Sequence, residues 1–317
     1  MRLEVHSPDG VGEVRAGDDL LTMVLPLVDL EDGDVLVVTS KVVSKTEGRV
    51  GDGPREDAVA AQTARVEARR GATRIVRTHH GLTLAAAGVD ASNVTRGRHV
   101  LLPLDPDASA RALREQVRER TGRNVAVVVT DTAGRAWREG QTDIAIGAAG
   151  LVVLDDHEGR LDAYGNPLAV TAPAVADEVA GAVELAQGKL AARPVGVLRG
   201  RADLVLPAGE HGSGAAALVR PEGGDLFGWG AREAVLRAVR ARPDDAAPFG
   251  SPVDAAGLVA VLDEALAADA EVLGADEVRC TGAGPLVAVL AFAHGWVPDP
   301  AAAPGRTWML RPLPLGP

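Results

Sequence analysis

Three aspartates stand among small residues, in settings where a carboxylate can do chemistry. Asp90 lies in AAAGVDASNV, Asp131 in VVVTDTAGR and Asp143 in GQTDIAIG. The first two each follow an apolar segment and precede small polar residues. Such oxygen-rich sites suit a hard cation such as Mg²⁺ or Mn²⁺, which proteins bind through one or two carboxylates plus substrate phosphates. For each aspartate, capping or turn formation is the alternative interpretation.

Lysine is rare in this chain, and its placement indicates a second candidate site. Of the 33 basic residues only Lys41, Lys45 and Lys189 are lysines, and the first two lie in TSKVVSK after an apolar run. A compact ammonium beside hydroxyl groups can contact a nucleotide phosphate. A polar loop end, or chance survival of lysine in an arginine-rich chain, is the alternative. The sequence has no GxxxxGK[ST] loop and no GxGxxG turn, so it supports neither a P-loop nor a Rossmann site.

A third candidate is the stretch GRAWREGQTD, which gathers Arg135, Arg138 and Gln141 around Trp137. Arginine presents a planar fork of donors that suits a carboxylate or a phosphate. We therefore expect Arg135 and Arg138 to hold anionic substrate groups. A solvated basic turn with a half-buried tryptophan is the alternative.

The elements that must position these residues alternate between strand and helix, which predicts an α/β or α+β fold. The β-branched runs predict strands over 33–45 and 125–131, the second turning at Gly134. Ala-rich periodicity predicts a helix over 55–70 that stops at Gly71. The clearest helix is expected over 105–121, with Gly122 as its C-cap.

Composition excludes several classes of protein. The net charge of −11 and an aromatic content of 3% argue against nucleic-acid binding. No apolar run reaches the ~18 residues of a membrane span, and the N-terminus lacks a signal-peptide pattern, so we expect a cytoplasmic protein without a membrane partner. A single cysteine, Cys280, excludes an internal disulfide and a cysteine-rich metal site.

The chain divides by composition into two parts. We expect a main domain over 1–242, a Pro-rich linker over 243–252 and a short α/β extension over 253–317. An extension of about 65 residues is thin for an independent core. Its role is not indicated by any motif.

The ordered motifs GDVLVVTSKVVSKTEGR, AAAGVDASNV, LLPLDPDASARALR, VVVTDTAGRAWREGQTDIAIGAAGL, DAYGNPLAVT and AVADEVAGAVELAQGK together resemble the coenzyme F420-0:L-glutamate ligase family over roughly residues 1–240. The resemblance implies that family's mixed α/β fold and an intertwined homodimer. It also implies GTP as co-substrate and one or two Mg²⁺ or Mn²⁺ ions. The implied reaction attaches L-glutamate to the lactyl carboxylate of F420-0 through an acyl phosphate, and then extends the tail by γ-linked glutamates.

The resemblance assigns roles residue by residue. Asp90 and Asp131 match the metal-binding aspartates, and Thr132 matches a further metal contact. In the N-terminal nucleotide loop this chain reads GVGEV where the family commonly has a GLP turn. Asp131, Lys45 and, by inference from its chemistry, Arg135 are the expected catalytic residues. The expected nucleotide contacts are Val11, Gly12, Glu13, Val14, Ser40, Lys45, Asn93, Gln187, Gly188 and Lys189.

Some bacterial relatives carry an additional flavin-binding domain. The extension over 253–317 is too short for it, so we predict no FMN. Two alternative functions stay open at this point. One is a GTP-dependent ligase or phosphotransferase acting on another carboxylate, and the other is a non-catalytic nucleotide-binding relative.

Overall fold

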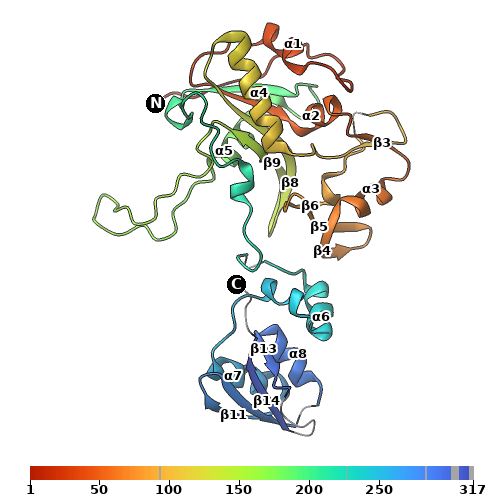
Figure 1. The fold of residues 1–317 in the computed structure, drawn as a ribbon, viewed down its shortest axis with the longest axis vertical. Coiled ribbons are helices and arrows are strands. Elements are labelled where there is room, and N and C mark those ends of the chain that lie inside the picture. Colours follow the sequence, from red (N-terminus) through yellow and green to blue (C-terminus); the bar gives the residue numbers. More distant parts are fainter. Residues whose placement is uncertain (93, 226, 283, 301–306, 314–317) are drawn as a thin grey trace. The chain divides into compact units, whose positions relative to one another are not determined.

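The computed structural model describes the chain except for residues 93, 226, 283, 301–306 and 314–317. The described residues form two compact units. The first comprises Met1–Arg65 and Ile75–Val219, and the second comprises Val66–Arg74 and Arg220–Pro317. Both contain helices and strands (Figure 1), which confirms the prediction of a mixed α/β chain.

A five-stranded sheet forms the centre of the first unit. The third and fourth strands in spatial order are the only neighbours of this sheet that pair parallel, with Thr39 opposite Thr130. The remaining neighbours pair antiparallel. From one edge to the other the strands are β1 (Glu4–His6), β10 (Val195–Arg199), β2 (Val35–Thr39), β8 (Ala126–Arg135) and β9 (Arg138–Ala149).

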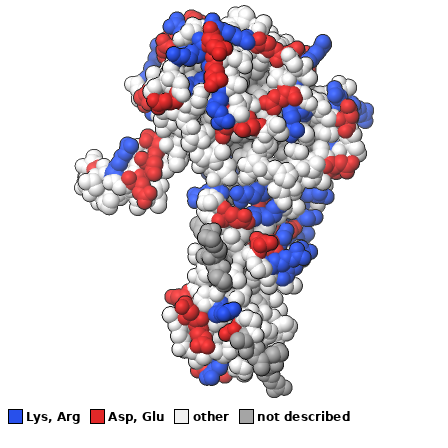
Figure 2. Space-filling view, in the orientation of Figure 1, with Lys and Arg blue, Asp and Glu red and all other residues white. Residues whose placement is uncertain are grey.

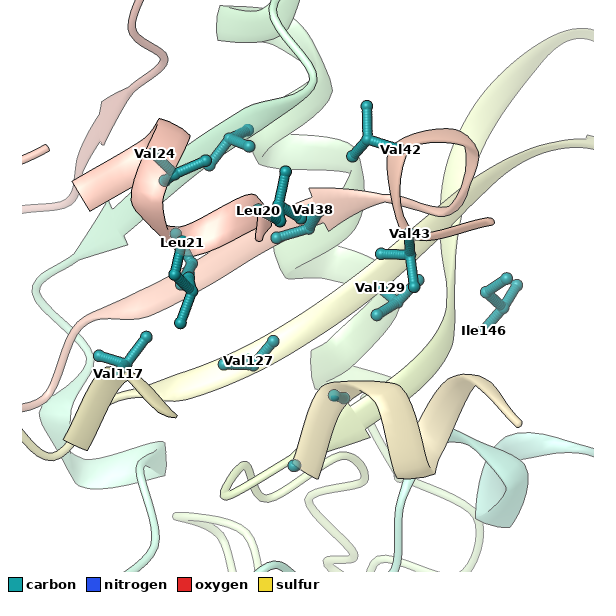
Figure 3. Close-up of a cluster of buried hydrophobic side chains, with 14 of the residues drawn as sticks. Leu20, Leu21, Val24, Val38, Val42, Val43, Val117, Val127, Val129 and Ile146 are labelled. Atoms are coloured by element: carbon teal, nitrogen blue, oxygen red, sulfur yellow. The ribbon is translucent and has the colours of Figure 1, made fainter. Parts of the chain in front are cut away.

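Helices cover both faces of this sheet. Because side chains of a strand alternate between faces, Val127 and Val129 of β8 enter one core, whereas Ala126 and Val128 enter another. Figure 3 shows Val127 and Val129 in the first core, together with Leu21 and other side chains of the covering helices. The helices of this core are α1 (Leu20–Val24), α2 (Ser40–Thr46) and α4 (Pro106–Thr121), and α5 (Val175–Gln187) covers the second.

Local capping explains where two of these helices begin and end. Asp19 and Asp105 cap α1 and α4 by accepting backbone N–H groups. Gly122 ends α4 in the left-handed conformation at a φ of 75°. The caps of α4 at Asp105 and Gly122 agree with the sequence-based prediction.

Two strand and helix boundaries differ from those predictions. The strand expected over 33–45 ends at Thr39, and α2 begins at Ser40. The helix expected over 55–70 ends at Gln62, and residues 63–70 form a strand instead. The tertiary pairing of that strand outweighs its helix propensity, and Gly71, at a φ of 58°, makes a turn between two strands.

Two small sheets and one helix lie between α2 and α4 in the chain. The helix is α3 (Arg55–Gln62). The strands are β3 (Val50–Asp52) with β7 (Arg98–Val100), and β4 (Thr63–Arg70), β5 (Thr73–Thr78) and β6 (Thr83–Ala85). Short 3-10 turns are η1 (Leu25–Leu27), η2 (Ala86–Gly88), η3 (Ala202–Leu204), η4 (Ala215–Leu218), η5 (Pro243–Asp245) and η6 (Ala247–Phe249).

The hairpin of β8 and β9 also departs from the expectation. Gly134 lies inside β8, and the chain turns at Ala136 and Trp137, where Trp137 takes a φ of 53°. Trp137 is 80% exposed, so it is not the half-buried side chain of the alternative interpretation. The register that pairs Arg135 with Arg138 leaves Ala136 and Trp137 as the two-residue connection, and such a connection takes positive φ, as Trp137 does.

The second unit has its own hydrophobic core. The residues of this core lie in the extension over 253–317, which was expected to be thin for an independent core. The unit also includes residues 220–252 and the tip of the β4–β5 hairpin, where Gly230 N–H donates to Glu67 O. Cys280 and Trp296 are buried in this core. Its elements are α6 (Ala231–Arg240), α7 (Ala255–Leu266), α8 (Leu286–Ala293), and the sheet β11 (Asp269–Gly274), β12 (Glu277–Thr281), β14 (Thr307–Pro312) and β13 (Trp296–Pro298).

Charges are intermingled on the surface. Figure 2 shows acidic and basic side chains side by side over the visible face of the first unit. In the part of the chain that the structure describes, no helix combines the length and apolar character needed to cross a bilayer.

Substitution of Gly147 tests how closely α4 packs against the sheet. A Cβ at this position would lie 2.3 Å from the Pro106 carbonyl oxygen, so Gly147→Ala must push the first turn of α4 away from β9. We expect a loss of about 2–3 kcal/mol in the free energy of unfolding, measured by urea denaturation. Gly134→Ala in the same hairpin meets open space and is the matched control. Equal stability of the two variants would contradict this account.

Candidate functional site

The candidate site begins where the two parallel strands end. Because β2 and β8 are parallel, their carboxyl ends meet at one edge of the sheet, which is where open α/β sheets bind ligands. At this edge β2 leads into α2, whose first residue is Ser40, and β8 continues to Asp131. Ser40 Oγ donates a hydrogen bond to Asp131 Oδ1 at 3.2 Å. Two predicted site residues, distant in sequence, are thus brought together.

Asp90 is fixed by its own backbone and by a lysine. Its N–H and C=O both bond to Val100, at 3.0 and 2.7 Å. The Ser92 N–H and hydroxyl donate to the Asp90 carboxylate at 2.7 and 2.8 Å. Lys41 Nζ lies 2.6 Å from Asp90 Oδ2 and also donates to Ser92 Oγ. The carboxylate is therefore oriented and neutralised.

The two predicted metal-binding carboxylates differ in proton affinity. Burial raises the pKa of Asp131 to about 6, and the charges of Asp143 and Asp90 add to this effect against the hydrogen bonds from Ser40 and Thr132. For Asp90, burial alone would raise the pKa, but the hydrogen bonds from Lys41 and Ser92 outweigh it and lower the pKa. Negative charge at Asp131 is thus in excess, which a bound cation would relieve.

Thr132 belongs to the opposite face of β8, because successive side chains alternate. Its hydroxyl donates to Asp143 Oδ1 at 2.7 Å, and Thr130 donates to the other oxygen of Asp143 at 3.1 Å. Lys189 Nζ donates to Thr132 Oγ at 2.7 Å. The predicted metal ligands therefore form two groups, Asp90 with Asp131 on one side and Thr132 on the other.

The predicted nucleotide loop contacts α2. Lys45 is buried, and its Nζ lies 2.7 Å from Glu13 Oε1. Val14 of the same loop, which comprises Val11, Gly12, Glu13 and Val14, is part of the core around α1 and α2. The pairing fixes the loop over the helix that carries Ser40 and Lys45.

The segment that follows α5 contacts the site on the face of β8 that carries Thr132. Gln187 is buried, and among the described residues none accepts a hydrogen bond from its Nε2. Gly188 follows at a φ of 63° and leads to Lys189, which reaches Thr132. Asn93, the remaining predicted nucleotide contact, lies outside the described residues.

Arg135 and Arg138 are not brought to the carboxylates. They face each other across the hairpin turn, and Arg135 donates to the Glu139 carbonyl at 3.1 Å. Four residues of extended strand separate Arg135 from Asp131, a span of roughly 13 Å. The expected turn at Gly134 is therefore wrong, because the chain turns at Ala136 and Trp137, and the role of Arg135 and Arg138 in holding an anionic substrate group stays a prediction.

Two residues of the site were not assigned a role from the sequence. Lys41 was noted only as part of TSKVVSK, and Asp143 only as a third structured aspartate. Lysine is rare in this chain, and the structure places two of the three lysines at the site, Lys41 on Asp90 and Lys189 on Thr132. The hairpin register, which places Thr132 opposite Asp143, was the missing information.

The donor set fits a hard divalent cation. Its atoms are carboxylate and hydroxyl oxygens, and two of them already contact an ammonium group. Among the described residues no three His, Cys, Asp or Glu side chains converge on one point. A cation held here would therefore take other ligands from substrate phosphates or water, as Mg²⁺ commonly does.

The raised pKa of Asp131 has a consequence for stability. Its folded pKa of about 6 exceeds the ordinary 3.8, so its burial lowers stability progressively from about pH 4 to pH 6. In metal-free buffer, Asp131→Asn should be more stable than the parent by about 3 kcal/mol at pH 7, and the difference should vanish at about pH 3, below both pKa values. Urea denaturation across this range measures the difference. If the difference in free energy of unfolding between Asp131→Asn and the parent does not change with pH, the pKa of Asp131 is not raised in the folded protein.

Comparisons with known proteins show the family to which the chain belongs. A protein of Archaeoglobus fulgidus named Coenzyme F420:L-glutamate ligase is 39% identical over 208 residues, covering 60% of this chain and 84% of its own. Proteins of the same name from Methanopyrus kandleri and Methanothermobacter thermautotrophicus are 38% and 36% identical over 68% and 72% of this chain, and 93% and 99% of theirs. The profile of the F420-0:Gamma-glutamyl ligase family matches residues 10–200, and the chain belongs to this family.

Proposed function

We propose that this protein ligates L-glutamate to the lactyl carboxylate of F420-0, using GTP and Mg²⁺ or Mn²⁺, and then adds further γ-linked glutamates. The names of its relatives support the substrates. One observation carries the proposal most directly. Asp90 and Asp131, together with Lys41 and Lys189, lie at the carboxyl edge of two parallel strands, where a nucleotide and a cation can be held together.

The chemistry requires activation of a carboxylate. In the proposed reaction a carboxylate oxygen of F420-0 attacks the γ-phosphorus of GTP, and GDP leaves. The glutamate amine then attacks the acyl carbon of the resulting acyl phosphate, loses a proton and expels inorganic phosphate. When bound, a divalent cation neutralises phosphate charge. No covalent enzyme nucleophile is needed, and Cys280 is buried in the core of the second unit.

Each site residue has a proposed role in this scheme. Asp90 and Asp131 would hold a cation on one side of β8, and Thr132 would hold a second on the other. Lys45 would contact phosphate as a point charge. Arg135 and Arg138 would contact an anionic group of a substrate that extends roughly 13 Å from Asp131. Further proposed nucleotide contacts are Val11, Gly12, Glu13, Val14, Ser40, Asn93, Gln187, Gly188 and Lys189.

We also propose a cytoplasmic homodimer with the domain division at 242. Residues 155–173 run as a long arm away from the sheet (Figure 1). Three apolar side chains on this arm, Leu161, Tyr164 and Val170, are exposed, the last two to 92%. A second copy of the chain is a suitable partner for such an apolar surface.

The direct test is incubation of the protein with F420-0, GTP, Mn²⁺ and L-glutamate, followed by mass spectrometry. The expected product is heavier than F420-0 by one or more glutamyl residues and forms together with GDP. Asp131→Asn should lower turnover at least 100-fold while the protein stays folded, because the site loses the charge that holds the cation. Asp203→Asn, which removes an exposed carboxylate whose described ion pair is with Arg201, is the matched control.

Two outcomes would redirect the proposal. Hydrolysis of GTP without any glutamylated product, across Mg²⁺ and Mn²⁺, would favour a ligase or phosphotransferase for another carboxylate. Full activity of Asp131→Asn would show that the cation is held elsewhere.

A further inference from the structure

Two of the three lysines contact atoms that are proposed to bind a cation. Lys41 Nζ lies 2.6 Å from Asp90 Oδ2, and Lys189 Nζ lies 2.7 Å from Thr132 Oγ. The third, Lys45, instead pairs with Glu13, which is not a proposed metal ligand. The two ammonium groups therefore stand where cations would be expected.

The hydroxyl of Thr132 is prepared to face a cation. Its single proton is donated to Asp143 Oδ1 at 2.7 Å, so its remaining lone pairs can only accept. Lys189 uses one of them. Asp143 itself is 5% exposed, and its backbone N–H is bonded to Glu184 at 3.0 Å, which fixes its position. The hydroxyl orientation is thus set by the fold rather than by the lysine.

We propose that Lys41 and Lys189 are internal counter-ions that divalent cations displace from Asp90 and Thr132. This inference rests on the proposed function, because it assumes that these oxygens are the metal ligands. An ammonium on a flexible four-carbon stem can leave one acceptor and reach another without backbone movement. In the absence of metal the lysines balance the carboxylates, and after exchange their charges are available to nucleotide phosphates.

Charge and side-chain chemistry support the exchange. The charges of Asp143 and Asp90 act on Asp131, and the described ion pair of Asp90 is with lysine. Thirty of the 33 basic residues of the chain are arginines. A planar guanidinium binds a carboxylate through two parallel hydrogen bonds and is harder to displace than a single ammonium.

The exchange predicts the metal affinity of lysine variants without nucleotide. Mn²⁺ binding, measured from the electron paramagnetic resonance signal of free Mn²⁺, should be roughly tenfold tighter in Lys41→Met and in Lys189→Met, since each loses a competing cation. Lys41→Arg and Lys189→Arg keep the charge and should bind Mn²⁺ no more tightly than the parent. Lys45→Met is the matched control, with a change of about twofold or less expected.

Three results would overturn the inference. They are unchanged or weaker Mn²⁺ binding in both Met variants, equal tightening in all three lysine variants, and no Mn²⁺ binding by any of the proteins. Circular dichroism confirms that each variant is folded. Glutamylation is scored separately, so product formation with unchanged Mn²⁺ affinity refutes the exchange alone. Tighter Mn²⁺ binding without glutamylated product supports the exchange and refutes the ligase.

Discussion

The parallel pairing of β2 with β8 is the constraint on which the candidate site depends. It aligns Thr39 with Thr130, so that the next residues, Ser40 and Asp131, meet although 91 positions separate them. The cores on both faces of the sheet hold this register, because a slip by one residue would reverse every side chain of β8. The same alternation sends Asp131 and Thr132 to opposite faces, and divides the site into two halves.

The site also depends on a balance between its carboxylates and its lysine side chains. Burial raises the cost of ionising Asp131, and the carboxylates of Asp143 and Asp90 lie near enough to add to it. Lysine supplies the compensating charge in a chain that otherwise uses arginine. A compact, singly bonded ammonium is suited to a place where positive charge must be exchanged. The proposed exchange thus accounts for lysine, rather than arginine, at Asp90 and Thr132.

Much of this arrangement was accessible from local sequence pattern. The strands leading to Ser40 and Asp131, the helix ended by Gly122 and the motif string of the family were all predicted, and the structure or the comparisons confirm them. The errors came from long-range pairing, which local pattern does not contain. Residues 63–70 read as helix but pair as a strand, and the hairpin register that joins Asp143 to Thr132 fixes a turn two residues beyond Gly134. The metal and nucleotide roles stay predictions.

The central claim is that this edge of the sheet activates a carboxylate by phosphorylation. It is tested most directly with F420-0 whose lactyl carboxylate carries ¹⁸O, incubated with GTP, Mn²⁺ and L-glutamate. If an acyl phosphate forms and the amine attacks its carbonyl carbon, one ¹⁸O must leave with the released inorganic phosphate. Mass spectrometry of that phosphate should therefore show one labelled oxygen for each F420-0 molecule that receives its first glutamate, whereas phosphate released when further glutamates are added carries no label. Product that carries a single glutamate and is accompanied only by unlabelled phosphate would contradict the account.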